Sequence, residues 1–295
     1  MAKVEHLAQL QQGALQWKEW RSANPSVQPD LSQADLSRMD LSGFDLSHAN
    51  LREANLWEAQ LVATDLTAAI LQKVNLSHAN LTDAILNQAE LVHGMLVWAN
   101  LTGAELCDAI LMGADLRRAS LREANLFRAN LVGSEIWGVN LQEANLCGAD
   151  LQRTNLSRAV LIDANLSDAN CERTNFYQTE LNQAHLYRTI LRGANLQEAN
   201  CTGAYLYSAD LSEAILSEAN FSWANLTQAN LNQAELRATN LRGAKLRRAN
   251  LSKADLTNAN LRGADLNKVN LTATILTNAE LSDTNLRRPL PDNIT

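Results

Sequence analysis

An apolar residue stands at every fifth position from Leu31 to Leu286, which makes 52 consecutive positions without a break. All are leucine except Ile136, Cys171, Phe176, Cys201 and Phe221. On an α-helix, a step of five residues turns by about 140°, so these side chains would point in all directions. Along a flat strand, the same step changes sides each time, so alternate leucines would face water. A chain that makes a quarter turn every five residues buries all of them on one axis.

Four such repeats would close a square coil of 20 residues, and stacked coils would pair like parallel strands. A small residue, usually alanine, lies two places before each core position, as at Ala34 and Ala49, where we expect a crowded interior. The residue directly before the core position is most often Asn or Asp. We expect these two types in the turns because they tolerate left-handed backbone and bond to it locally. The spacing predicts an all-β solenoid of about thirteen coils over residues 29–288.

The repeat itself resembles that of a known family. The stretches "ANLREANLWEAQL" and "ANLTQANLNQAEL" are similar to the A(D/N)LXX consensus of pentapeptide repeat proteins, which are abundant in bacteria and especially in cyanobacteria. The resemblance covers most of the chain and implies a right-handed quadrilateral parallel β-helix. It implies less about function, because the family is functionally diverse.

The two ends differ from the repeat. Residues 1–28 are expected to form a short helical cap and lead-in, since open strand edges invite aggregation unless they are covered. Apolar residues at a three/four spacing predict an amphipathic helix over residues 3–22, ended by "ANP" at 23–25: Val4, Leu7, Leu10, Ala14 and Trp17. The stretch "GALQWKEWRSANPSVQPDL" also resembles a helical lead-in of many bacterial pentapeptide repeat domains.

Residues 289–295 are expected to form a C-terminal tail. Pro289 and Pro291 block further strand pairing there. The prolines and Leu290 would form a small plug, or two molecules would meet end to end, which leaves a monomer or an end-to-end dimer.

Residues 20 apart should form columns on the outer surface, and the first notable column is aromatic. It predicts one contact patch, which consists of Tyr187, Tyr205, Tyr207 and His185, with Phe127 further along the same column. Exposed aromatic residues gather at protein interfaces. The alternative is that stacked aromatic rings only stabilise neighbouring coils.

The second candidate patch is aliphatic. It comprises Val92, Met112 and Val132, which are expected to stack in consecutive coils, and Ile110 beside Met112. Trp98 and Trp137 are expected on an adjoining face. A contiguous apolar patch on a protein surface often marks a contact site.

Charge is unevenly distributed along the chain. The formal net charge is -7, yet residues 231–295 carry ten Lys and Arg against six Asp and Glu. Such polarity could steer the orientation of a partner. The negative total opposes nucleic-acid binding through the basic end.

No arrangement of residues typical of catalysis or metal binding is found. The five histidines fall on different columns or distant coils, and the four cysteines match no zinc or redox spacing, so four free thiols are expected. We predict no catalytic residue, no cofactor and no metal. No apolar run is long enough to span a membrane, and the N-terminus lacks the apolar run of a signal peptide, which favours a cytoplasmic protein without a membrane partner.

These observations favour a non-enzymatic module for protein–protein interaction, a scaffold or a regulator, that presents flat faces to an unknown protein. The resemblance adds an alternative, because some family members are DNA mimics that inhibit or protect a type II topoisomerase such as gyrase. A mimic of this kind carries dense acidic rows. This chain departs from that pattern in its modest charge, its Arg/Lys-rich end and its lack of a C-terminal helix.

Overall fold

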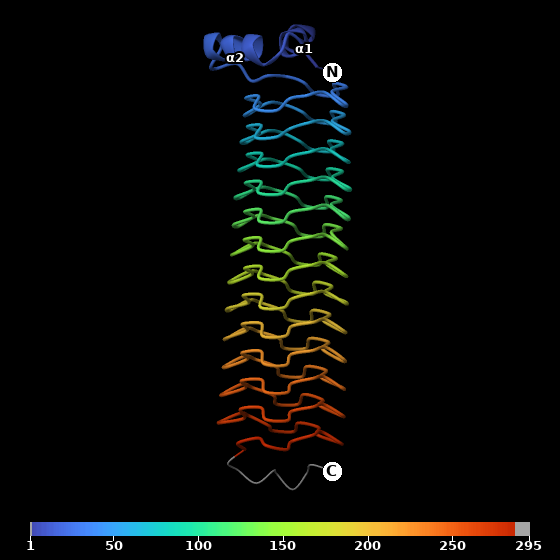
Figure 1. The fold of residues 1–295 in the computed structure, drawn as a ribbon, viewed down its shortest axis with the longest axis vertical. Helices are drawn as coiled ribbons and strands as arrows, with labels where there is room; N and C mark the ends of the chain where they lie inside the picture. Colours follow the sequence, from blue (N-terminus) through green and yellow to red (C-terminus); the bar gives the residue numbers. More distant parts are fainter. Residues whose placement is uncertain (1, 287–295) are drawn as a thin grey trace. The chain divides into compact units, whose positions relative to one another are not determined.

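The computed structural model describes residues 2–286, which belong to two compact units: the first ends at Asn145 and the second begins at Leu146 (Figure 1). The first runs from blue to green in the figure and the second continues to red. The expected tail with Pro289, Leu290 and Pro291 lies outside the described residues.

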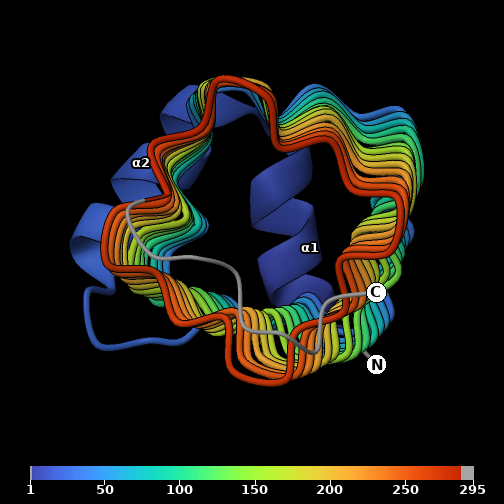
Figure 2. The same ribbon diagram turned by 90° about the horizontal axis from the view of Figure 1, so that it is seen from below.

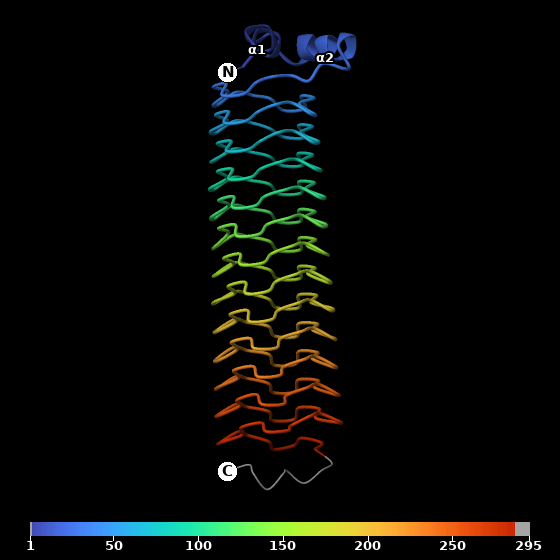
Figure 3. The ribbon, with the colours of Figure 1, turned by 180° about the vertical axis from the view of Figure 1, so that it is seen from behind.

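Both units are built from parallel bridges between residues 20 apart. In the first unit the bridges run from Asp30↔Asn50 to Asn125↔Asn145, and in the second from Asp150↔Asn170 to Asn260↔Glu280. Within the described residues, each bridged segment is a single residue instead of a longer strand. One bridge every five residues gives each coil four sides, so each unit is a solenoid, as the repeat predicts (Figures 2 and 3).

The predicted core is confirmed. Every residue of the five-residue series from Leu31 to Leu266 exposes at most 2% of its surface, including Phe176 and both cysteines of the series. The alanines two places earlier are buried as well. The interior of each unit is therefore filled by stacked leucine and alanine side chains, which removes apolar surface from water along every coil.

The prediction that Asn or Asp supplies the left-handed backbone is wrong for the residue before the leucine. The left-handed residue is the second one after the leucine, as in Gln33, Arg38 and Glu53, whose φ angles are 60°, 60° and 57°. The Asn or Asp is bridged instead, and its side chain makes the expected local bond. The Asn195 Oδ1 atom accepts the N–H of Gln197 at 3.1 Å.

The same amide side chains also link one coil to the next. The Asn195 Nδ2 atom donates to Oδ1 of Asn175 at 3.1 Å, and Asn175 donates in turn to Asn155 at 3.2 Å. One side chain thus closes a turn and joins two coils, which explains why the amide is favoured at a position without left-handed backbone.

The N-terminus forms two helices where one was predicted over residues 3–22. Helix α1 spans Val4–Gln11 and helix α2 spans Ala14–Ala23. Gly13 between them has φ 99°, a conformation that L side chains rarely adopt, and it breaks the predicted helix. Because of the break, Leu10 and Trp17 are buried while Val4 and Ala14 of the predicted apolar face are exposed. Neither described helix is long and apolar enough to cross a membrane.

Both helices contact the first coil. The backbone N–H of Asp30 donates to Nδ1 of His6 in α1 at 2.8 Å, and Nε1 of Trp17 in α2 donates to the carbonyl oxygen of Asp45 at 2.7 Å. Figure 2 shows α1 lying across the end of this coil. These bonds fix both helices relative to the start of the first solenoid.

Candidate protein-interaction surfaces

The aliphatic column of the first unit lies at one turn of consecutive coils. The N–H of His93 donates to the carbonyl of Met112 at 3.0 Å, and the N–H of Gly113 donates to that of Val132 at 3.1 Å. Met112 is exposed, whereas Val92 and Val132 are half-buried. Ile110, two residues before Met112, is half-buried at a bridge to Asn130.

The two tryptophans of this candidate patch are joined by a cation that the sequence analysis missed. The Arg118 Cζ atom lies 5.2 Å from the ring centroid of Trp98 and 5.0 Å from that of Trp137, within cation–π distance of both. Trp98 is 51% exposed. Arg118 follows Trp98 by 20 residues, so the column rule contained the signal. Met95, which is exposed on the same side of the repeat as Trp98, was also missed.

The aromatic residues of the second unit form two stacks. The Tyr187 and Tyr207 rings lie 5.8 Å apart at an interplanar angle of 8°, and the His185 and Tyr205 rings lie 4.9 Å apart at 34°. Each stack joins consecutive coils, as the bridge His185↔Tyr205 shows. Tyr187 and Tyr205 remain exposed. The rings can thus stabilise the coils and still offer surface to a partner.

Phe127 belongs to the first unit, so the predicted aromatic column is divided between the two units. Its exposed ring lies 5.9 Å from Cζ of Arg128.

Among the described residues of the second unit, the most exposed large apolar side chain, Trp223, was missed. It is 62% exposed, and its ring lies directly over the turn at Gly243, where an added Cβ would collide with it. In its column Gly203 precedes Trp223 by 20 residues, and Gly243 and Gly263 follow at 20-residue steps; these glycines were a readable signal for space beside the ring.

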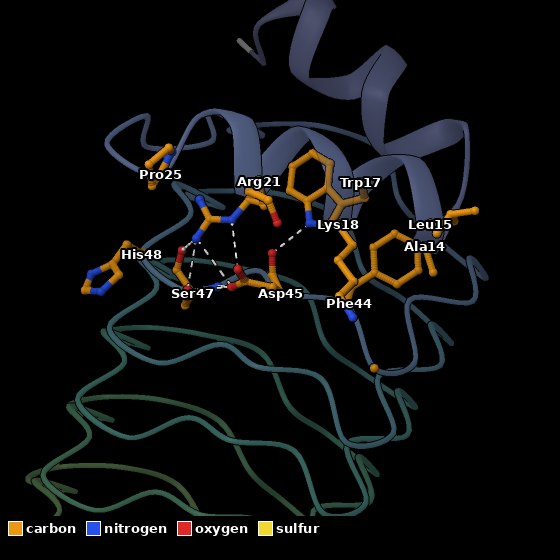
Figure 4. A pocket seen from close by; sticks show the side chains of 12 residues that line it. Ala14, Leu15, Trp17, Lys18, Arg21, Pro25, Phe44, Asp45, Ser47 and His48 are labelled. Carbon is orange, nitrogen blue, oxygen red and sulfur yellow. Dashed lines mark hydrogen bonds and ion pairs between the residues drawn. The ribbon is translucent and has the colours of Figure 1, made fainter.

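A cleft of about 820 Å³ lies between α2 and the start of the solenoid (Figure 4). Arg21, whose side chain is only 12% exposed, donates from Nε to Oδ2 of Asp45 at 3.0 Å and from an Nη atom to the Oγ of Ser47 at 3.0 Å. Burial opposes ionisation of Asp45, but the bonds from Arg21 and Ser47 outweigh it and lower the pKa of this carboxyl group. The polar groups of this wall satisfy one another, and the bonds of Arg21 link α2 to the first coil.

The four cysteines are free, as expected. Burial raises the pKa of the Cys171 and Cys201 thiols far above the usual range of a cysteine, because the charged thiolate would lie in an apolar interior. Across residues 2–286, no three His, Cys, Asp or Glu side chains lie together in a group that could hold a metal ion.

Comparisons with known proteins identify the repeat. The family model described as "Pentapeptide repeats (8 copies)" matches nine segments: residues 30–67, 59–93, 96–133, 124–161, 154–193, 194–233, 214–252, 234–272 and 254–288. No curated protein matches the chain significantly.

Solved structures include several similar chains. HetL, a pentapeptide repeat protein involved in heterocyst differentiation regulation from the cyanobacterium Nostoc sp. strain PCC 7120, is 34% identical over 79% of this chain and 89% of its own, with a TM-score of 0.27. Rfr23 from the cyanobacterium Cyanothece 51142 is 31% identical over 52% of this chain and 88% of its own, with a TM-score of 0.16. A trypsin-treated form of QnrB1, a plasmid-mediated fluoroquinolone resistance protein, is 21% identical over 64% and 86%, with a TM-score of 0.47.

Proposed function

Because the chain belongs to the pentapeptide repeat family, we propose that it is a non-enzymatic interaction or regulatory module that binds a protein partner on its outer faces. The observation that carries this proposal is the contrast between inside and outside. The interior of each unit is filled with leucine and alanine, whereas large aromatic and aliphatic side chains such as Trp98, Met112, Tyr205 and Trp223 are exposed. Exposed aromatic residues of this kind are enriched at protein interfaces.

The proposal also includes four more specific features of the fold and its setting. They are the right hand of the solenoid, thirteen coils, a capping role for α1 and α2, and a cytoplasmic setting. The capping role is supported by the bonds of His6 and Trp17 to the first coil.

The topoisomerase alternative has less support. A DNA mimic needs uninterrupted rows of carboxylates. The bridged column of the first unit that contains Asp65 continues with Ile85, Glu105 and Asn125, so amide and apolar side chains interrupt it. Loss of gyrase supercoiling at micromolar protein would reverse this preference.

Affinity capture from a cyanobacterial lysate tests the proposal. The baits are the full chain, a first-surface variant (Trp98→Ala with Met112→Ser) and a second-surface variant (Tyr187, Tyr205 and Tyr207 each changed to Ala). Matched controls are Arg122→Ala, an exposed residue half a coil away from Met112 in the first unit, and Tyr177→Ala in the second. A protein that is retained by the full chain and both controls but lost by one surface variant would support the proposal. If the full chain captures no protein, the proposal is wrong.

A further inference from the structure

One side of the second unit is almost free of carboxylates although the whole chain is acidic. We call it the acid-free face and define it as residues 182–188, 202–208, 222–228, 242–248 and 262–268. These five segments are stacked, as the bridges from His185 through Tyr205, Asn225 and Lys245 to Asp265 show. They contain seven Lys and Arg and one carboxylate, that of Asp265, in a protein with a net charge of -7.

The cations concentrate in the segment "RGAKLRR" at 242–248, where all four are exposed: Arg242, Lys245, Arg247 and Arg248. Arg188 and Arg262 of the face pair with Asp168 and Asp283. Within residues 2–286, by contrast, no salt bridge involves any of the four cations at 242–248. Their charge is therefore available to a partner.

The single carboxylate offsets this charge only in part. Asp265 accepts hydrogen bonds from Nδ2 of Asn285 at 2.7 Å and from the N–H of Asn267 at 3.0 Å, and the first of these lowers its pKa most. Arg247 also lies near enough to lower that pKa. Asp265 is half-buried, whereas the four cations point into solvent.

The aromatic residues of the second-unit patch lie on the same face, above the cations. His185, Tyr187, Tyr205 and Tyr207 occupy the first two segments, and Trp223 lies in the third with its ring over Gly243. At about 4.8 Å per coil, Tyr205 and Lys245 lie roughly 10 Å apart, within the reach of one bound segment. Tyr, Trp and Arg are the residue types that dominate binding energy at protein interfaces.

We infer that the acid-free face docks an acidic segment of a partner protein, whose carboxylates meet residues 242–248 and whose apolar side chains meet the tyrosines and Trp223. This inference rests on the proposed function and adds the location of the site and the chemistry of the partner. Charge complementarity is the basis for the choice, because this face carries seven Lys and Arg against one carboxylate in a chain whose net charge is -7.

Single-stranded nucleic acid fits the face less well. Its bases bind by stacking on open aromatic rings. Tyr187 and Tyr207 are instead stacked on each other at 8°, and the Tyr207 hydroxyl bonds to Oε1 of Gln228 at 2.9 Å. One face of each ring is therefore already occupied.

The test uses two fluorescent probes, a decaglutamate peptide and a deoxythymidine decamer, whose binding to the full chain is followed by anisotropy at low salt. The face variant changes Lys245, Arg247 and Arg248 to Glu. The repeat tolerates Glu at the equivalent positions Glu180, Glu172 and Glu198, so the variant should fold. The control variant changes the exposed Arg153, Arg158 and Arg173 of the same unit to Glu, with the same change in charge on other columns.

The full chain and the control variant should bind decaglutamate, and the face variant should bind it at least about tenfold more weakly. Failure of the full chain to bind decaglutamate, or an equal loss in both variants, would overturn the inference. Tighter binding of the thymidine decamer, lost in the face variant, would overturn the partner class. If the protein captured from lysate is retained by the face variant and lost by the Trp98/Met112 variant, the proposed function stands and the inference fails.

Discussion

At the scale of single residues, the interior is less uniform than the repeat suggests, because threonine replaces the inward alanine at several positions. The Thr174 hydroxyl donates to the carbonyl oxygen of Leu151 in the previous coil at 2.6 Å, and Thr179 donates to that of Leu156 at 2.9 Å. Thr64, Thr189, Thr239 and Thr274 make the same bond. At these six sites the coil before offers the buried hydroxyl an acceptor, whereas the buried Ser134 hydroxyl donates to the Leu131 carbonyl of its own coil at 2.7 Å.

Changing Thr174 to Val removes this bond and keeps the volume of the side chain. The Leu151 carbonyl still accepts the N–H of Thr154, so the free energy of unfolding should fall by only about 1 kcal/mol. Urea unfolding followed by circular dichroism measures the change. An unchanged midpoint would show that the hydroxyl contributes nothing to stability.

The cysteines should differ in reactivity by position. Cys171 and Cys201 are fully buried and their pKa values are raised by burial, so iodoacetamide should not label them in the native protein. The half-buried Cys107 and Cys147 should be labelled first, and all four should react in denaturant. Mass spectrometry of peptides after a time course reads each site. Rapid native labelling of Cys171 would contradict the packed interior.

At the scale of elements, the N-terminal helices depend on side-chain contacts with the first coil. His6 in α1 is buried, packs 5.0 Å from the ring of Trp20 and accepts the N–H of Asp30 at Nδ1. Burial, followed by the positive charge of Lys3, lowers the pKa of this histidine. The neutral ring is therefore the form that holds α1 in place.

This arrangement predicts a pH dependence. As pH falls below about 6.5, the unfolded state takes up the proton first, because its histidine has the higher pKa. The contribution of His6 is thus complete above that pH and is lost as pH falls through the lowered pKa of the folded state. Hydrogen exchange of α1 amides should accelerate between pH 7.5 and pH 5.5, after correction for intrinsic rates.

The control is His6→Asn, whose side-chain oxygen can accept the Asp30 N–H but does not titrate in this range. It should start from a lower stability because the ring contact with Trp20 is lost, and its corrected exchange should not depend on pH. An equal pH dependence in the variant would assign the effect to another group.

At the scale of the whole molecule, the sequence was sufficient for the repeat path and for the neighbours of each side chain within a unit. The five-residue period predicted the buried series from Leu31, and the 20-residue step predicted the stacks of Tyr187 on Tyr207 and of His185 on Tyr205. Both follow from backbone geometry, which the repeat fixes. The N-terminal break was less visible, because apolar spacing continues across Gly13 while its backbone does not.

The repeat assigns each residue to a column, but it does not give the direction of each side chain. The position of Arg118 between two tryptophans and of Trp223 over Gly243 depends on rotamers and on space left by neighbouring turns. The acid-free face is hidden in any count along the chain, because its five segments are separated by acidic residues of other columns, such as Glu198, Glu213 and Glu235. Only the assignment of each residue to a side of the coil reveals it.

The most direct measurement is lysine footprinting of the full chain, free and bound to the captured partner. An amine-reactive acetylating reagent labels exposed lysines, and mass spectrometry reads each one. Lys245 and Lys268 of the acid-free face should lose reactivity in the complex, while Lys73 and Lys253, exposed on another column of the repeat, should keep theirs. Equal labelling of Lys245 in both states, with protection elsewhere, would contradict docking on this face.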